Sequence, residues 1–339
     1  MSLENLPAYD DVGTPLFGSR RRAFNLFNEM VYQGVIKIDS VDTCFCGESD
    51  FSRLSRFDRF GLPFGTQICR SCGLITQTLR VKSESLPLFY ERIYWPLVTG
   101  DAPNYATKAD SDEALALISK YLPSGNSKNV TVFEVGCGAG GRIEKVGEAL
   151  AGLGCETTLV GCDYSDDAIS IAASKGIKTI RGGMDELSQA GQADILILSH
   201  VFEHLPDLDQ ATDQINLLVH DDSLIYMEVP GVIDLENKTE YLYDYQLYNV
   251  LAHMFNFSLT TLSQVMGTKG FVLIEGDEYV RAIFTKGNVS TTPKSGYSEI
   301  IAALDRANVK RGRIRKHRNN PVIKYARNLA KSLLGRETG

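Results

Sequence analysis

The sequence predicts an α/β protein with a doubly wound parallel sheet, a small cysteine-rich module before the sheet and a basic helix after it. Short apolar runs alternate with helical stretches from Val130 onward, a glycine-rich turn follows the first run, and four cysteines form two close pairs upstream. Alternating strands and helices are typical of a parallel sheet covered on both faces. With 339 residues, 43% of them hydrophobic, the chain can bury one large core and carry smaller attached units.

The expected units follow one another along the chain. They are a helical segment at 1–40, a cysteine module at 41–80, an aromatic linker at 81–125, the sheet domain at 126–290 and a basic helical tail at 291–339. Apolar residues at helical spacing predict a helix over Ser19–Gln33. In the linker, Tyr90, Tyr94 and Trp95 either pack against the core or cover a substrate.

The sheet domain shows five apolar runs of strand length. We expect strands at Val130–Val135, Thr158–Cys162, Lys178–Arg181, Asp194–Ser199 and Leu224–Val229, with helices at Gly141–Leu150, Asp166–Lys175 and Asp207–Val219. A later pair, Phe271–Glu275 and Glu278–Phe284, predicts the antiparallel strands that close many such sheets.

A glycine-rich turn, Gly136-Cys-Gly-Ala-Gly-Gly141, ends the first strand and opens the first helix of a Rossmann-like fold. Its backbone amides and the helix N-terminus can face a bound cofactor without an obstructing Cβ atom. Taken alone the turn is ambiguous, because Gly136, Gly138 and Gly141 also fit a dinucleotide-binding turn, with Asp163 where a ribose-binding acid is expected.

Three features favour S-adenosylmethionine over a dinucleotide. Glu134 places a carboxylate beside the turn, where a pyrophosphate is disfavoured; Asp163 ends the next strand; and an apolar strand runs into the Glu203-His-Leu loop. In this order the motifs resemble those of class I S-adenosylmethionine-dependent methyltransferases. The resemblance implies cofactor contacts from Glu134, Gly136, Cys137, Gly138, Asp163, Tyr164, Asp185, Ser199 and His200, of which Asp185 is offset from the usual position.

Four of the seven cysteines are candidate metal ligands in two knuckles. Cys44-Phe-Cys46 and Cys69-Arg-Ser-Cys72 are each followed by glycine and are separated by 22 residues. Four thiolates form a closed tetrahedral zinc site, which is structural and not catalytic. We expect zinc to supply the folding energy of the small loop or hairpin between the pairs.

The residues around the second knuckle narrow the family. Cys69–Leu74 reads CxxCGL and is followed by Phe89-Tyr90 and Tyr94, which resembles the zinc-binding region of sugar methyltransferases, notably deoxysugar C-methyltransferases. His253 stands in a segment that resembles their H-x-x-x-F-S motif, and the resemblance implies that it is the general base. A histidine packed on an aromatic surface is the alternative. We expect Glu203 and His204 to support catalysis. His220 is expected to lie in a polar loop.

The charge of the chain is asymmetric. Its net charge is −7, yet Arg306–Arg336 contains eleven Lys and Arg and no Asp or Glu. An acidic body argues against a nucleic-acid groove. The amphipathic stretch Pro321–Leu334 predicts an interfacial helix that docks on an anionic membrane surface or on an acidic protein surface, its own included. We expect a cytoplasmic protein, peripheral at the inner membrane face if the tail binds lipid.

The sequence therefore predicts a methyltransferase that acts on a nucleotide sugar or a surface polysaccharide. Deoxysugar C-methyltransferases carry a further large C-terminal domain, and only about fifty residues follow Lys286, so O-methylation is favoured over C-methylation. A non-catalytic scaffold that retains the cofactor fold and a nicotinamide-dependent enzyme acting on sugars are the alternatives.

Overall fold

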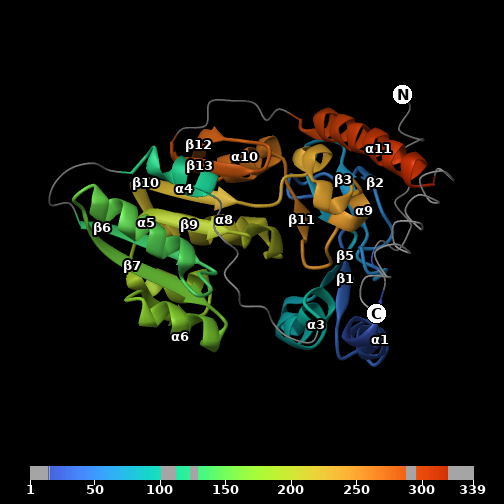
Figure 1. The fold of residues 1–339 in the computed structure, drawn as a ribbon, viewed down its shortest axis with the longest axis horizontal. Helices are drawn as coiled ribbons and strands as arrows, with labels where there is room; N and C mark the ends of the chain where they lie inside the picture. The colour runs from blue at the N-terminus through green and yellow to red at the C-terminus, as the bar shows by residue number, and fades with distance from the viewer. Residues whose placement is uncertain (1–13, 15, 101–111, 123–128, 288–294, 320–339) are drawn as a thin grey trace, which may run out of the picture.

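The computed structural model describes residues 14, 16–100, 112–122, 129–287 and 295–319. Its centre is a seven-stranded sheet of order β12-β13-β10-β9-β6-β7-β8 (Figure 1). The strands are β6 Asn129–Val135, β7 Glu156–Asp163, β8 Lys178–Arg181, β9 Ala193–Ser199, β10 Val219–Glu228, β12 Phe271–Gly276 and β13 Arg281–Lys286. The strands from β10 to β8 pair in parallel, and β13 joins antiparallel to β10 and β12. The predicted α/β sheet and its closing antiparallel pair are confirmed.

Helices cover both faces of this sheet. They are α4 Asp112–Ser119, α5 Gly141–Gly152 and α6 Asp166–Ser174 on one face, and α7 Met184–Leu187, α8 Leu208–Leu218 and α10 Leu259–Gly267 on the other. Successive residues of a strand point to opposite faces. Val132 accordingly packs under α5, whereas the next residue, Phe133, belongs to the core cluster that contains α8.

In the cysteine module, the segment between the cysteine pairs forms the predicted hairpin, and two further strands extend it into a larger sheet. This four-stranded antiparallel sheet has the order β11-β4-β3-β2. The strands are β2 Phe51–Arg53, β3 Thr66–Cys69, β4 Ile75–Gln77 and β11 Phe255–Asn256, and a separate pair joins β1 Ile38–Ser40 to β5 Leu79–Val81. Because β11 lies only two residues after His253, the module and the sheet domain are joined beside the predicted base.

The N-terminal and linker segments are helical. Their helices are α1 Gly18–Tyr32, α2 Leu86–Phe89 and α3 Trp95–Val98, with one π-helical turn at Tyr90–Tyr94 between the last two. Phe27, Phe64 and Phe89 pack their rings together in the core of this unit. The linker is therefore packed, although Trp95 remains 42% exposed.

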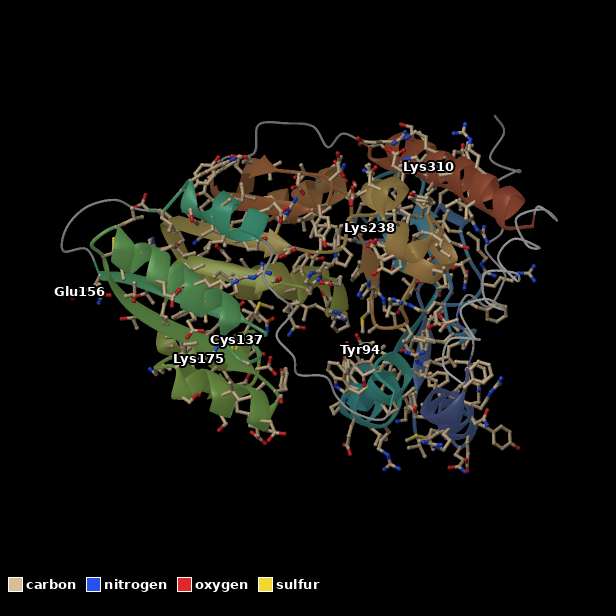
Figure 2. The ribbon with its side chains drawn as sticks, in the orientation of Figure 1. Tyr94, Cys137, Glu156, Lys175, Lys238 and Lys310 are labelled. Atoms are coloured by element: carbon tan, nitrogen blue, oxygen red, sulfur yellow. The ribbon has the colours of Figure 1, made fainter. Side chains whose placement is uncertain are left out.

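The basic tail begins as helix α11, Tyr297–Asn319, which lies over the cysteine module (Figure 1). Ile300, Leu304 and neighbouring apolar residues of this helix are buried against the short helices Ile233–Asn237 (η6) and Tyr245–Tyr248 (α9). Arg306 and Lys310 contact the Glu236 side chain, and Arg311 lies 2.6 Å from Asp244. Lys310 and Lys238 lie at the same end of the molecule (Figure 2).

The first part of the basic segment thus docks on acidic residues of its own chain. The amphipathic stretch Pro321–Leu334 lies outside the described residues. His220 belongs to strand β10 and not to a polar loop, because the strand begins at Val219; its Nε2 lies 3.3 Å from Asp194. Of the helices in the described ranges, none is both long enough and apolar enough to cross a bilayer.

Candidate active site

The glycine turn forms an open cradle at the carboxyl end of β6. Gly136 and Gly138 have φ of +66° and +52°, a left-handed conformation that disfavours side chains. A Cβ atom on Gly138 would have no protein atom within 4 Å, so the space above the turn is open. The buried Glu134 accepts the amide N–H of Ile143 at 3.2 Å and orders the start of α5.

Cys137, in the same turn, has its side chain turned into the core. The thiol is buried against Gly161, and its backbone N–H donates to the carbonyl of Cys162 at 3.0 Å. Burial raises the pKa of this thiol. Cys137 therefore shapes the turn, and neither its amide nor its thiol faces the open cradle. Figure 2 labels Cys137 at this position.

Asp163 lies beside the turn at the end of β7. Its Oδ2 accepts the N–H of Gly138 at 3.0 Å, and its Oδ1 accepts the N–H of Ser165 at 2.9 Å. Each carboxylate oxygen retains a lone pair for a ribose hydroxyl. The carboxylate is thus fixed next to the cradle, as a cofactor ribose requires.

The two other predicted cofactor residues on this side are exposed. Tyr164 is 71% exposed, with its hydroxyl near Gly183. Asp185 is turned toward α8, where its Oδ1 accepts a hydrogen bond from Gln214 at 2.5 Å. The structure therefore shows Asp185 in a contact with α8, and its role toward the cofactor stays a prediction.

At the end of β9, Ser199 and His200 meet an acid that the sequence analysis did not single out. Glu228, at the end of β10, accepts a hydrogen bond from Ser199 Oγ at 3.1 Å and pairs with Arg142 at 2.5 Å. Burial alone would raise the pKa of Glu228, but Arg142 and His200 lower it, so Glu228 is ionised. The sequence could have indicated Glu228, because it is an acidic residue at the end of a predicted buried strand. His200, with φ of +54°, donates its backbone N–H to the Glu228 carbonyl.

Glu203 lies at the centre of a group of three histidines. Its side chain is 1% exposed, and its Oε1 lies 3.4 Å from His200 Nδ1, 3.7 Å from His204 Nε2 and 4.0 Å from His253 Nε2. Neither carboxylate oxygen accepts a hydrogen bond from the described residues. The Met254 N–H, which donates to the Glu203 carbonyl at 2.8 Å, fixes the β11 segment against this loop. The structure therefore brings together all three predicted catalytic residues.

Burial and neighbouring charges set the protonation states of Glu203 and His253 in the protein without its ligands. Burial would raise the pKa of Glu203, but the surrounding histidines, His204 foremost, lower it to about 2, so its carboxylate is ionised. Burial, reinforced by the charge of His204, lowers the pKa of His253 to about 3. His253 is consequently neutral and able to accept a proton. The adjacent carboxylate would stabilise the imidazolium that forms, as in an acid-histidine dyad.

His204 orients the group from the other side. Its Nδ1 lies 3.0 Å from the carbonyl of Ala252 and 3.5 Å from the Tyr90 hydroxyl. Its ring stands edge-on to that of His253, with 5.0 Å between the ring centroids. Because a carbonyl only accepts, His204 Nδ1 carries a proton and Nε2 faces Glu203.

Glu203, His204 and His253 are also of the residue types that bind metal ions. One atom each of Glu203, His204 and His253 lies within 4.8 Å of the others. A tetrahedral zinc holds its nitrogen and oxygen ligands about 3.3 Å apart. The distances of 3.7 and 4.0 Å from Glu203 to the two histidines are wider than this spacing, so these side chains are less closely gathered than the ligands of a bound zinc.

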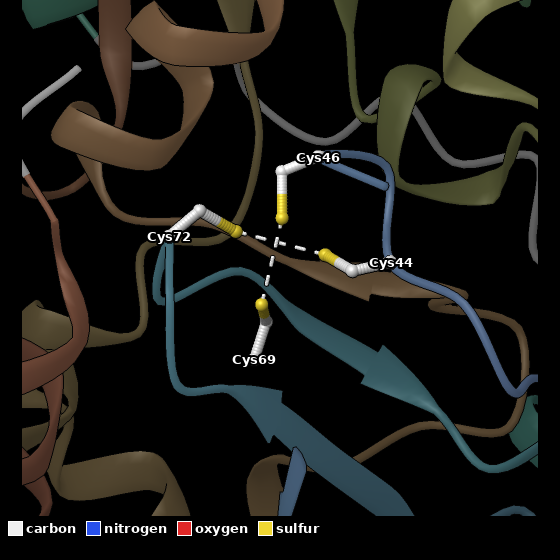
Figure 3. A group of neighbouring side chains, drawn as sticks. All are labelled: Cys44, Cys46, Cys69 and Cys72. Carbon is white, nitrogen blue, oxygen red and sulfur yellow. Dashed lines mark hydrogen bonds between the residues drawn. The ribbon is translucent and has the colours of Figure 1, made fainter. Parts of the chain in front are cut away.

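The four predicted metal ligands do match zinc. Their thiols point at a common centre (Figure 3), with Sγ–Sγ distances of 3.6 Å for Cys44–Cys72 and for Cys46–Cys69. A tetrahedron with Zn–S bonds of about 2.3 Å has edges of about 3.8 Å. Gly47 and Gly73, with φ of +87° and +89°, close the two knuckles. This four-cysteine cluster can hold a structural zinc.

Comparison with known proteins identifies the family to which the chain belongs. A sequence family described as a methyltransferase domain matches residues 105–275, half of the chain. The chain belongs to this family. The methyltransferase is 24% identical over 219 residues to "C-methyltransferase NovU" of Streptomyces niveus, an alignment that covers 63% of this chain and 47% of NovU. It thus spans about half the length of this curated relative.

Solved structures show distant likeness to the methyltransferase. A protein of Listeria monocytogenes described as an S-adenosylmethionine-dependent methyltransferase is 15% identical with a TM-score of 0.40, covering 52% of this chain and 98% of its own. The plantazolicin methyltransferase BpumL, solved in complex with SAH, is 20% identical with a TM-score of 0.36, covering 53% and 69%. Family membership and the sheet topology confirm the predicted class I methyltransferase domain.

Proposed function

We propose that this protein transfers the methyl group of S-adenosylmethionine to a sugar, with His253 as the general base. The observation that carries the proposal is the neutral His253 beside the ionised, buried Glu203, next to the loop that follows β9. Methyl transfer from a sulfonium is an in-line displacement, so the enzyme positions the acceptor and removes its proton. Both tasks need groups at the carboxyl ends of the parallel strands, where these residues lie.

The cradle fits the cofactor. The Gly136–Gly138 turn and Asp163 would hold its ribose and methionine parts, with Ser199 and His200 near the sulfonium. When bound, S-adenosylmethionine supplies the methyl group, and its C–S electron pair stays on sulfur. His253 takes the proton of the acceptor, and Glu203 stabilises the charge that His253 gains.

A sugar acceptor is supported by the residues around the second cysteine knuckle. The CxxCGL segment and Tyr90 resemble those of sugar methyltransferases, and Tyr90 lies against His204. Tyr241 offers a further ring, 5.5 Å from that of the buried Tyr248. Aromatic faces and hydroxyls suit a sugar. The similarity to the C-methyltransferase NovU supports carbon as the methylated atom, whereas O-methylation remains a prediction from the sequence.

The test is incubation with methyl-labelled S-adenosylmethionine and a panel of nucleotide sugars and polysaccharides, followed by mass analysis. We expect label in one sugar, and the fragment masses assign it to oxygen or carbon. Binding of the cofactor product without label in any sugar would contradict the sugar proposal. Label appearing in a non-sugar acceptor would replace it.

We also propose that the tail beyond α11 binds an acidic surface. The contacts of Arg306 and Arg311 with acidic residues of this chain support a protein surface over lipid. Liposome co-sedimentation of the full chain and of a chain truncated after residue 319 distinguishes the two. Equal sedimentation of both with anionic vesicles would exclude lipid binding by the tail.

A further inference from the structure

Arg59 is a cation without an anionic partner among the described residues. Its Nε is buried and makes no hydrogen bond, and no carboxylate of the described part of the chain lies within ion-pair distance of it. The guanidinium carbon lies 5.7 Å from the centroid of the Phe60 ring and 5.8 Å from that of Tyr241. Burying an unpaired charge costs stability, so its presence needs a reason.

The neighbouring Asp58 does not neutralise this charge. Its Oδ1 points into its own turn and accepts the N–H groups of Phe60 and Leu62 at 3.0 and 2.8 Å. Burial raises the pKa of Asp58 to about 7, which further weakens it as an anion. Asp58 therefore shapes the turn that carries Arg59.

This turn holds Arg59 firmly. The Arg59 N–H donates to the carbonyl of Asn249 at 3.0 Å, and the Gln246 side chain donates to the carbonyls of Phe57 and Asp58 at 3.0 and 2.6 Å. Arg59 is thus positioned by the segment that leads to His253. These contacts fix the backbone from which the Arg59 side chain extends.

Arg59 and the candidate base share one environment. The charge of Arg59 contributes to the lowered pKa of His253 and opposes the burial that raises the pKa of Tyr94 to about 12. A chain of ring contacts connects Tyr94 to the base: the Tyr94 ring lies 5.2 Å from that of Tyr90, whose hydroxyl lies 3.5 Å from His204 Nδ1, beside His253. A guanidinium matches the two oxygens of a carboxylate or a phosphate. The rings of Phe60 and Tyr241 contact the guanidinium but carry no negative charge, so its hydrogen-bond donors are available to an anion.

We propose that Arg59 binds an anionic group of the acceptor, a phosphate or a carboxylate, and so places the reactive atom of the acceptor against His253. This inference rests on the proposed function and narrows its substrate class to anionic sugars. The phosphate would belong to a nucleotide sugar, and the carboxylate to a uronic acid.

Isothermal titration with three probes tests the proposal: UDP, D-glucuronate and S-adenosylhomocysteine, with D-glucose as the neutral match of glucuronate. We expect the wild type to bind UDP or glucuronate and Arg59→Met to bind the same probe at least ten-fold more weakly, since a charged hydrogen-bonded contact is worth roughly ten- to hundred-fold in affinity. Arg59→Lys keeps the charge without the fork and should fall between them. Arg53→Met, at an exposed position of β2, is the matched control and should bind like the wild type.

The results distinguish a phosphate from a carboxylate as the anionic group that Arg59 binds. A loss confined to UDP assigns a phosphate, and a loss confined to glucuronate assigns a carboxylate. Failure of the wild type to bind either anion, or equal anion binding by Arg59→Met, overturns the proposal. An equal loss of S-adenosylhomocysteine affinity also overturns it, because Arg59 would then serve the cofactor. Failure of the wild type to bind S-adenosylhomocysteine counts against the proposed function alone.

Thermal unfolding excludes a merely structural role. Because Arg59→Met removes a half-buried charge that has no anionic partner among the described residues, and replaces it with a side chain of similar length, we expect an unfolding temperature equal to or above that of the wild type. A clear decrease, together with unchanged anion binding, would make Arg59 a structural residue.

Discussion

The four-cysteine cluster and the Glu203 group both gather four polar side chains, yet they differ in completeness. The cysteines come from two short knuckles, and their spacing matches a tetrahedral ion. Glu203 and its histidines come from segments about fifty residues apart, and the distances from Glu203 to His204 and His253 are too wide for hydrogen bonds or for zinc. A closed set of ligands stabilises a fold, whereas a buried, ionised carboxylate beside a neutral histidine is the kind of perturbed pair that marks functional sites.

The largest effect should come from breaking the complete cluster. Replacing Cys69 by serine removes one of four thiolates, and structural zinc in small domains contributes on the order of 10 kcal/mol to folding. We expect zinc to fall from one per chain to none and the module to unfold. Elemental analysis and near-ultraviolet circular dichroism measure the two effects. Cys155→Ser, at a buried site in the sheet domain, is the control and should keep the zinc.

Zinc loss should also loosen helix α11. The N–H of Gly296 donates to the Cys72 carbonyl at 2.9 Å, so the helix begins on the second knuckle. Limited proteolysis of Cys69→Ser should cut near residue 296. A second zinc per chain that disappears in a His253 variant would instead make the Glu203 group a metal site and break the comparison.

The next largest effect should come from the incomplete group. His253→Gln keeps the size and polarity of the side chain but cannot accept the acceptor proton, and general-base catalysis contributes about 10²- to 10⁴-fold. We expect kcat to fall by that factor with unchanged affinity for S-adenosylhomocysteine. His220→Gln, on β10, should leave kcat unchanged. Full turnover by His253→Gln would remove the base assignment.

A smaller effect is expected at the cradle. Asp163→Ala removes the carboxylate that is held by Gly138 and Ser165. Loss of hydrogen bonds to a charged group should weaken S-adenosylhomocysteine binding by roughly ten- to hundred-fold in titration calorimetry. Asp167→Ala, exposed on α6, is the matched control. Unchanged affinity in Asp163→Ala would place the ribose elsewhere.

The smallest effect concerns pH. The folded-state pKa of His253 is about 3, below its ordinary value of 6.5, so between these values the unfolded chain binds a proton that the folded chain does not. The contribution of His253 to the free energy of unfolding is therefore fully present above pH 6.5. It is lost as pH falls, by at most about 1.4 kcal/mol per pH unit. Urea unfolding above pH 4.5 avoids the contribution of Glu203, which acts only below its ordinary value of 4.5. Asp58, whose pKa is raised to about 7, acts in the same window with the opposite sign, so the contribution of His253 is read from the difference between the wild type and a His253 variant.

Between pH 4.5 and 6.5, the unfolding free energy of the His253→Gln variant should decrease relative to that of the wild type as pH rises, because the variant lacks the contribution of His253 and keeps that of Asp58. His220→Gln should retain the wild-type slope. Identical slopes in all three proteins would mean that His253 is not held neutral by burial.

The sequence alone determined the features that depend on neighbours along the chain. The strands of the sheet, the glycine turn, Asp163 and the cysteine pairs all follow from local periodicity, left-handed glycines and short spacings. These signals are local because backbone geometry repeats every two residues in a strand and every 3.6 in a helix. These local signals were enough to predict the fold class and the glycine turn that forms the cofactor cradle.

The tertiary structure decided which of the remaining polar residues meet. It turns Asp185 toward Gln214, buries the Cys137 thiol, and adds β11 to the cysteine module, so that His253 reaches Glu203. It also leaves Arg59 without an anionic partner in the described ranges. Partnership and burial depend on segments far apart in the chain, and no periodic pattern records them. The chemistry at the ends of the strands therefore becomes readable only once the chain is folded.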